Sequence, residues 1–484
     1  MNKIIYNDFA ANAEKNVIVP ASGSSDYQKC NELLSENDRV ILNYASFEKE
    51  GIDLLDETLY LAEENDNIGY ISSGISDISK SISNTLVISL SNGYYSAPGI
   101  TFYFYKDYCD KMAITWLKDD KEESKIEVDV SPKPTTESKI LEFYYENKVE
   151  SFNKIKIEFK HTYYPNQFIK LAGIDLGVKR EITEFHSNIE IFTEIDIDCA
   201  DVPGSTCDFA AEIKDFKPSQ AQSFYVYGKN KLFGKFYVDN IISLGNNRYS
   251  FECSDAIMQL EKSTVLALSQ GNYSVSSLVK KIHDSSNLSI NANGYADSQL
   301  TGFIQEDTCR YAAAMLSFGT GCFLTGFAEK MLTLKKPCNK RNKIISASQI
   351  LGRAEYCEKS QYSQIVLKCF SENFDTIKSV NTAVNKNKKS TDSAEHKIFD
   401  QYSLIINENN RFNELIESGF GRNEITARIE LQDESLGDIL TVETPYDGLR
   451  IGIIKSMHII LGYNKITSTL TMIERGFSPK GSDE

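Results

Sequence analysis

Histidine and cysteine, the residue types that most often carry catalysis or hold metals, form no usable pattern in this chain. There is no His-x-x-x-His pair, no Cys-x-x-Cys and no Cys-His cluster, so the ligand spacing of zinc sites is missing. A Gly-x-Ser-x-Gly elbow, a P-loop and a dinucleotide-binding fingerprint are missing too. We predict no catalytic, metal or cofactor site, and we expect the protein not to be an enzyme. The five isolated histidines are His161, His186, His283, His396 and His458.

Acidic residues could still perform glycosidase chemistry, which needs only two carboxylates. The chain contains 68 acidic residues, however, so the sequence favours no particular pair. A cell-wall hydrolase stays open as a weaker alternative. Calcium binding is another use of carboxylates, but the densest group of acids does not match a calcium loop, and we interpret it as solvated turns. These acids are Asp53, Asp56, Glu57, Glu63, Glu64 and Asp66.

Composition narrows the class of protein further. The 484-residue chain has a net charge of −16, which argues against a nucleic-acid-binding surface because such surfaces need clustered Lys and Arg. Its one basic patch, residues 386–389, is interpreted as a solvated loop. The ten cysteines are scattered, several of them in apolar runs, which indicates reduced thiols in a core. We find no secretory signal and no apolar run of about 18 residues, so we expect no membrane-spanning helix.

The clearest secondary structure lies near the C-terminal end. Alternating apolar side chains over residues 451–461 predict a half-buried antiparallel strand. Further strands are expected at 439–442 and 465–475, with turns at 445–448 and 462–464 rich in Gly, Pro, Asp and Asn. This ending predicts a small β-barrel or sheet, not an active site.

The N-terminal third is dominated by short strands with polar turns, from about residue 16 to residue 177, as in a β-sandwich. Pro98-Gly99 is interpreted as a bend before a new strand. Aromatic residues on these strands are expected to fill the core and not to form platforms for sugars. The ones singled out are Phe102, Phe104, Trp116 and Phe159.

The middle of the chain changes its periodicity. Apolar residues spaced by three and four predict amphipathic helices over 275–282 and 305–318, the second ending at Gly319. A short helix is predicted over 408–417. The polar segment 371–397, with few large apolar residues, is predicted to be a mobile loop.

Two segments resemble the tail hub proteins of phages, the family of late control protein D and the baseplate hubs of contractile tails. Residues 232–260, with Leu-Phe-Gly-Lys-Phe-Tyr-Val-Asp-Asn-Ile and then Arg-Tyr-Ser-Phe-Glu-Cys-Ser-Asp-Ala-Ile, are similar to the first barrel of that family. Residues 431–476 resemble the strands that close its second barrel. The helix ahead of Gly-Cys-Phe-Leu-Thr at 321–325 is similar to the α+β domain inserted between the two barrels.

The N-terminal strands resemble the galactose-binding-like β-sandwich found at the N-terminus of many tail proteins of Firmicute phages. Four blocks occur in the expected order, at residues 69–73, 96–104, 115–116 and 170–177. Together the resemblances imply a mainly β protein with an α+β insert. The expected domains are a β-sandwich (1–180), a first hub barrel (181–262), the insert (263–340) and a second hub barrel (341–484) with the mobile loop 371–397.

The function implied by the resemblance is structural. The chain would belong to the tail of a phage, prophage or tailocin, assembled in the bacterial cytoplasm and located in the virion at the tail tip or baseplate. Its partners would be further copies, the tail tube and the spike proteins; three copies with two barrels each present six similar faces to a hexameric tube. The alternative is an adhesin whose sandwich binds a cell-surface glycan. The sequence leaves the host and the contractile or non-contractile type of tail open.

Overall fold

The chain divides into two compact units, and each is described by itself. In the computed structural model, the two-sheet unit comprises residues 6–181, and the large-sheet unit comprises residues 1–5 and 182–484. The structure describes residues 2–9, 18–20, 29–34, 39–43, 70–72, 74–90, 94–105, 108–129, 140–175, 177–213, 222–265, 267–286, 288–329, 331–336, 343–359, 361–370, 377–385, 396–402, 404–405, 408–418, 423–445 and 448–474.

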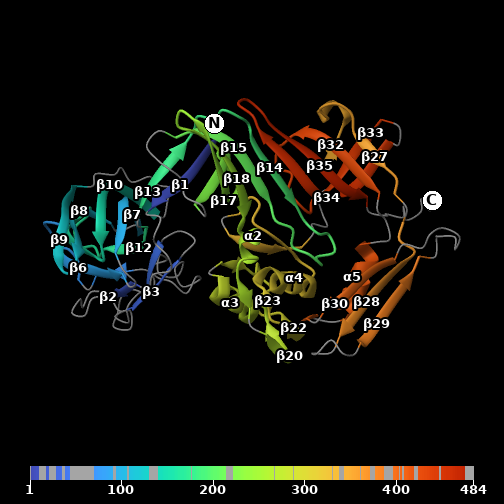
Figure 1. The fold of residues 1–484 in the computed structure, drawn as a ribbon, viewed down its shortest axis with the longest axis horizontal. Helices are drawn as coiled ribbons and strands as arrows, with labels where there is room; N and C mark the ends of the chain where they lie inside the picture. The colour runs from blue at the N-terminus through green and yellow to red at the C-terminus, as the bar shows by residue number, and fades with distance from the viewer. Residues whose placement is uncertain are drawn as a thin grey trace. The chain divides into compact units, whose positions relative to one another are not determined.

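Two antiparallel sheets make up the two-sheet unit (Figure 1). One has the strand order β10-β7-β12-β4-β3, with β5 paired to β12, and the other has the order β2-β6-β11-β8-β9. The strands are β2 (Ile18–Pro20), β3 (Lys29–Leu34), β4 (Arg39–Asn43), β5 (Tyr70–Ile71), β6 (Ser81–Leu90), β7 (Tyr95–Tyr105), β8 (Cys109–Lys118), β9 (Lys121–Asp129), β10 (Ile140–Phe152), β11 (Lys154–Thr162) and β12 (Lys170–Asp175), followed by β13 (Gly177–Ile182).

Side chains from both sheets share one apolar core. Because successive side chains of a strand point to opposite faces, Ile155, Ile157 and Phe159 of β11 are all buried while the residues between them are more exposed. The aromatic residues predicted to fill this core are confirmed there: Phe102, Phe104, Trp116 and Phe159 are at most 1% exposed.

The predicted bend at Pro98-Gly99 was wrong, because β7 continues through it. A Cβ atom on Gly99 would lie 1.9 Å from the carbonyl oxygen of Tyr145, so the glycine permits close approach of β10. The pairing of β10 with β7 shifts register between Glu146 and Val149, opposite this point. Such an irregularity accommodates a proline, which has no N–H for the ladder.

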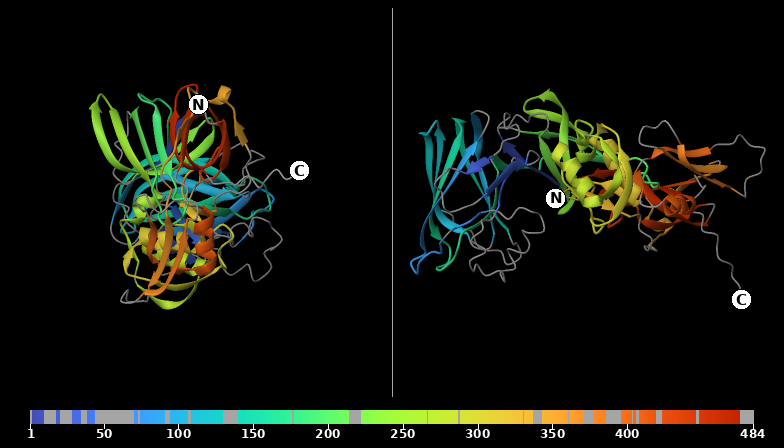
Figure 2. Two further views of the ribbon diagram at one scale, coloured as in Figure 1. Left: turned by 90° about the vertical axis from the view of Figure 1, so that its right-hand side faces the viewer. Right: turned by 90° about the horizontal axis from the view of Figure 1, so that it is seen from below.

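The large-sheet unit is built on one long curved sheet (Figures 1 and 2). Its strand order is β16-β17-β18-β15-β14-β34-β35-β32-β27, and β33 pairs with both β34 and β26. The first residues of β1 (Lys3–Phe9) also belong to this unit. The other strands are β14 (Ile189–Glu194), β15 (Thr206–Glu212), β16 (Ser223–Gly228), β17 (Lys231–Gly245), β18 (Arg248–Asp255), β26 (Lys343–Ile345), β27 (Glu355–Cys357), β32 (Glu424–Glu430), β33 (Ile439–Thr444), β34 (Gly448–Leu461) and β35 (Ile466–Glu474).

The pairing of β14 with β34 joins strands from the two predicted barrels. Ile189 lies opposite Leu461 and Glu194 opposite Ser456 in an antiparallel register. The predicted mainly β class is confirmed, and so are the C-terminal strands, which the structure shows as β33, β34 and β35. The arrangement as two separate barrels is not confirmed, because no strand pairing among the described residues closes either half on itself. The inner side of the sheet holds an aromatic cluster, in which Phe209 stacks on Phe251 at 4.7 Å and contacts Phe224.

Three helices and several short strands form an α+β region after β18. Its elements, all of which except β23 contribute to one apolar core, are α2 (Ala256–Leu260), β19 (Thr264–Val265), β20 (Leu268–Ser274), α3 (Val275–Ser286), β21 (Ile290–Asn291), β22 (Gln299–Ile304), β23 (Asp307–Thr308), α4 (Cys309–Thr320), β24 (Phe323–Thr325) and β25 (Leu332–Lys335). The predicted helix at 275 is confirmed. The next one begins at Cys309 and not at 305, because Thr308 caps it by accepting from Tyr311 N, and it ends before Gly321, whose φ of 62° suits a C-terminal cap.

A second, smaller sheet of the large-sheet unit has the order β29-β28-β30. Its strands are β28 (Gln364–Phe370), β29 (Ile377–Val384) and β30 (His396–Tyr402), and α5 (Glu408–Ser418) contributes Leu415 to the core on one side of it. Beyond β30, β31 (Leu404–Ile405) pairs with β22. The prediction of a mobile loop over 371–397 was wrong for residues 377–384 and 396–397, which belong to β29 and to the start of β30. In β29, Val380, Thr382 and Val384 alternate with small polar or Ala side chains and extend the sheet.

Candidate functional site

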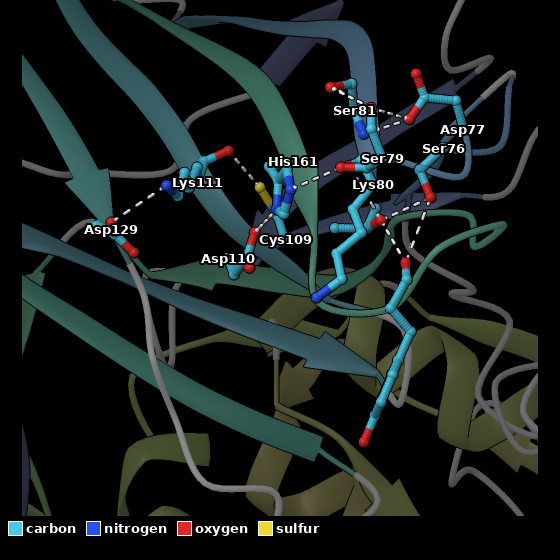
Figure 3. Close-up of polar contacts among 12 residues, drawn as sticks. Ser76, Asp77, Ser79, Lys80, Ser81, Cys109, Asp110, Lys111, Asp129 and His161 are labelled. Carbon is cyan, nitrogen blue, oxygen red and sulfur yellow. Dashed lines mark hydrogen bonds and ion pairs between the residues drawn. The ribbon is translucent and has the colours of Figure 1, made fainter.

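A polar cluster lies around His161 in the two-sheet unit (Figure 3). His161 Nδ1 lies 2.6 Å from Asp110 Oδ1, and Nε2 lies 3.1 Å from the Ser79 carbonyl oxygen. Both ring nitrogens therefore face oxygen acceptors. These contacts hold β11 to β8 and to the turn at Ser79.

Cys109 lies next to Asp110 but does not complete a nucleophile–base pair. Its thiol donates to the Lys111 carbonyl oxygen at 2.8 Å, and burial raises its pKa to about 12. A thiol with so high a pKa is not a thiolate at neutral pH, and the thiolate is the nucleophilic form. Figure 3 shows the hydrogen bond from the Cys109 thiol to the Lys111 carbonyl oxygen.

The same cluster fixes the segment that precedes β6. The Asp77 carboxylate accepts from Ser79 Oγ at 2.6 Å and from Ser81 N at 2.9 Å, and these bonds lower the pKa of Asp77. Thr162 Oγ1 donates to Ser76 Oγ at 2.6 Å. The arrangement is a polar clasp at one end of the two-sheet unit, and its hydrogen bonds are made within the protein.

The remaining histidines lie apart from one another among the described residues. His458 Nε2 lies 3.4 Å from Glu190, His186 Nε2 lies 3.7 Å from Glu212, and His283 Nδ1 lies 3.4 Å from the Leu288 carbonyl oxygen. His396 begins β30 and is exposed. Across the part of the chain that the structure describes, no three His, Cys, Asp or Glu side chains gather as a metal site.

Seven of the cysteines with described side chains are buried, as predicted for core thiols. Eight have described side chains; all eight are free and only Cys357 is exposed. The predicted solvated acids between Asp53 and Asp66 and the basic patch at 386–389 lie outside the described residues. No helix of the described ranges is long and apolar enough to cross a membrane.

A buried ionic cluster in the large-sheet unit was not foreseen from the sequence. Asp198 pairs with Lys397 of β30, and its carbonyl oxygen accepts from Arg411 of α5. The Arg411 guanidinium also lies 4.7 Å from the Phe318 ring and bonds Glu414 at 2.9 Å. Partners some 200 residues apart leave no local sequence signal, so only the fold could reveal this cluster.

Asp255 is a second buried acid that sequence reasoning missed. It caps α2 by accepting from Ile257 N at 3.0 Å and Met258 N at 3.4 Å. Its Oδ2 atom is buried and has no hydrogen-bond partner. Burial raises its pKa to about 6, against the opposing hydrogen bonds.

The outer side of the long sheet carries a row of acids that we call, with its apolar neighbours, the acidic face. Glu190, Asp208 and Glu252 lie opposite one another on β14, β15 and β18. Like charges directly opposite are unfavourable, and burial followed by these two neighbours raises the pKa of Asp208. The apolar members of the face are Phe192, Ile242 and Leu244, which are 42%, 48% and 56% exposed.

Only solved structures offered matches to known proteins. No protein-family model and no curated protein matches the sequence. The chain is similar to the tail protein from Neisseria meningitidis (TM-score 0.46, 11% identity, 61% of this chain and 94% of that chain). It is also similar to the 43 kDa tail protein of prophage MuSo2 from Shewanella oneidensis (0.45, 11%, 60% and 95%) and a prophage tail protein from Listeria monocytogenes (0.45, 13%, 61% and 91%). All three are named as tail proteins.

Proposed function

We propose that the protein is a structural component of a phage, prophage or tailocin tail, and that it forms the hub ring linking the tail tube to the tip or spike. The observation that supports this most is the β14–β34 pairing. Through this pairing, the strands of both hub-like segments of the sequence, 232–260 and 431–476, belong to one continuous sheet. A single rigid sheet drawn from both segments is suited to presenting a large surface to neighbouring proteins.

The polar clusters support a role without chemistry. Both ring nitrogens of His161 lie next to oxygen atoms, and the buried Cys109 thiol donates to a backbone carbonyl oxygen. Asp198 binds Lys397 through its carboxylate and Arg411 through its backbone carbonyl oxygen. Groups used in this way stabilise a fold and are poorly suited to proton transfer or nucleophilic attack. The role we propose is therefore mechanical, as a trimeric ring between tube and spike.

Purified particles test the proposal directly. Mass spectrometry of the particles is expected to detect the chain, and gold-labelled antibodies against it are expected to mark one end of the tail tube. An antibody against the major tube protein serves as the control and should label the whole length. Absence of the chain from particles, or labelling along the tube, would contradict the proposal. Light scattering of the isolated protein is expected to give three times the chain mass of 54.5 kDa.

A glycan-binding role of the two-sheet unit is the second candidate. The predicted core aromatics are buried, but Tyr164 is 49% exposed and packs edge-on against Tyr163 at 4.7 Å. An exposed ring of this kind can stack on a sugar. Binding of the full chain to a glycan array, lost in Tyr164→Ala and kept in Tyr144→Ala, would support this role. If the wild-type chain bound no glycan on the array, this role would be refuted.

A further inference from the structure

The chain leaves the long sheet after β27 and returns to it at β32, and these two strands lie side by side. They pair directly, with Cys357 opposite Glu424. Beside this pair, Lys359 N donates to Asn423 Oδ1 at 3.0 Å. We call the elements between these two points, β28, β29, β30, β31 and α5, the inserted module (Figure 1). Because its two connections are adjacent, they can act as a hinge without disturbing the long sheet.

The inserted module supplies most of an apolar core by itself. Of the buried side chains described in this core, one comes from outside the module, Phe318 of α4. The other five lie on β28, β30 and α5, so the module keeps its own packing when it separates from α4. These five are Ile365, Leu367, Cys369, Phe399 and Leu415.

Two cations of the inserted module converge on Asp198, which lies between β14 and β15. Lys397 of β30 pairs with the Asp198 carboxylate, and Arg411 of α5 donates to the Asp198 carbonyl oxygen. The Asp196 carboxylate fixes the position of this segment by accepting from Asp198 N at 3.1 Å and from Ala200 N at 2.7 Å. Both cations therefore lose their contacts together when the module moves away from this one residue.

The other polar attachments described for the module are short or exposed. β31 pairs with β22 over two residue pairs. Lys336 lies 3.7 Å from Glu414, and because both side chains are about half exposed, solvent screens their attraction. The Arg411 Nε atom is buried and makes no hydrogen bond among the described residues. A buried donor without a partner destabilises the docked arrangement, and exposure to water removes that cost.

We propose that the inserted module is a hinged arm, which swings away from Asp198 and Phe318 as a folded unit about the pairing of β27 with β32. Contacts of this ionic kind permit relative motion, whereas large apolar interfaces prevent it. The structure shows the closed state. A partner that binds the uncovered surface shifts the population toward the open state. This conformational device goes beyond the structural role proposed above and does not depend on it.

Native cysteines report on the state of the arm. Cys199 directly follows the anchoring aspartate and is 1% exposed. Burial raises the pKa of its thiol and the Arg411 guanidinium lowers it, so the guanidinium lies close to this thiol in the closed state. Opening of the arm removes Arg411 and exposes Cys199. Cys369 belongs to the core of the module and reports its unfolding, whereas Cys207 and Cys253 lie opposite each other in the long sheet and report global unfolding.

Labelling of the native full chain with N-ethylmaleimide, located by peptide mass spectrometry, tests the proposal without any substitution. The exposed Cys357 is expected to react first and serves as the reference for the reagent. Cys199 should react roughly 10-fold or more faster than Cys369, Cys207 and Cys253, because a local opening needs less free energy than unfolding. Equal rates at these four buried cysteines would overturn the inference.

A matched pair of lysine substitutions sharpens the test. Lys397→Met leaves a buried carboxylate without its ammonium partner in the closed state, and we expect labelling of Cys199 to accelerate roughly 100-fold while Cys369 keeps its rate. The control is the same change within the module, Lys378→Met, which breaks a pair with Glu408 at 3.8 Å and should keep the wild-type rate at Cys199. An unchanged rate at Cys199 in Lys397→Met, an equal acceleration at Cys369, or an acceleration in the control would overturn the inference.

Hydrogen exchange separates movement of the arm from opening of the segment that it covers. The amides of Ala200 and Asp201 donate to the Asp196 carboxylate. These amides and those of β28 should exchange no faster in Lys397→Met than in the wild type, because the arm and the covered segment both keep their own hydrogen bonds. Faster exchange at residues 200 and 201, together with faster labelling of Cys199, would show that the segment opens instead and would refute the hinge.

Discussion

The two units differ in whether they bury charged side chains. Six of the charged side chains described in the large-sheet unit are buried, whereas the buried polar side chains described in the two-sheet unit are Ser, Thr and Asn. A buried charge is costly unless it is paired, and here the partners come from remote segments: Asp198 with Lys397 and Glu434 with Lys343. We infer that apolar packing specifies the two-sheet unit, and that long-range ionic contacts help to specify the large-sheet unit. The six are Asp198, Lys235, Asp255, Arg411, Glu434 and Asp438.

The largest expected effect tests the apolar half of this comparison. Trp116→Ala removes the largest fully buried side chain of the two-sheet core. It is expected to lower the free energy of unfolding of that unit by about 3–5 kcal/mol, because transferred surface and a residual cavity both add to the cost. Hydrogen exchange followed by peptide mass spectrometry should show faster exchange in β8 and β11 and little change in β34. Ile78→Ala, at an 87% exposed position, is the control and should change neither.

The next effect tests the ionic half. Lys397→Met keeps the aliphatic stem but leaves the buried Asp198 carboxylate without its ammonium partner, so we expect a loss of about 3 kcal/mol. The same change in the two-sheet unit, Lys160→Met, breaks an exposed pair with Glu127 and should cost less than about 1 kcal/mol. Denaturant unfolding with exchange readout in β30 and β11 compares them. Equal losses at the two lysines would contradict the distinction between the units.

Local pattern explains what could be predicted from the sequence. The strand at 451–461, the helix at 275 and the aromatic core were predictable, because the spacing and the types of the apolar residues that indicate them can be read within a dozen consecutive positions. The pairing of β14 with β34 joins residues more than 260 positions apart, and no local pattern encodes it. β29 was missed because Asn, Thr and Ser interrupt its valines, although alternation at Val380, Thr382 and Val384 was a usable signal.

The candidate surfaces were hidden from sequence reasoning for the same reason. Glu190, Asp208 and Glu252 come from three strands, and only the sheet register aligns them. Asp255 is the last residue of β18, and its role as a helix cap depends on the turn into α2. The His161 clasp combines residues more than 50 positions apart, so the isolated histidines in the sequence could not predict it.

Asp255 gives the third prediction, in which loss of a charge stabilises the protein. Its folded-state pKa of about 6 exceeds the usual 3.8, so the folded state holds the proton more tightly and wild-type stability falls as pH rises from 4 through 6. Two pKa units correspond to about 3 kcal/mol. Asp255→Asn keeps a capping oxygen and should be more stable than wild type at pH 7 by up to that amount, and equal to it near pH 4. Denaturant unfolding across pH measures this.

The smallest effect has the opposite sign and lies in the two-sheet unit. Hydrogen bonds from Ser79 and Ser81 lower the pKa of the exposed Asp77, so its stabilisation is present above the ordinary pKa and is lost as pH falls through the folded-state value. Asp77→Asn should therefore be slightly less stable than wild type at pH 7 and equal to it at low pH. Exchange rates of the amides at the start of β6, measured beside Asp255→Asn, give the readout. If both variants shifted stability in the same direction at pH 7, the contrast between exposed, satisfied acids and buried, unsatisfied ones would fail.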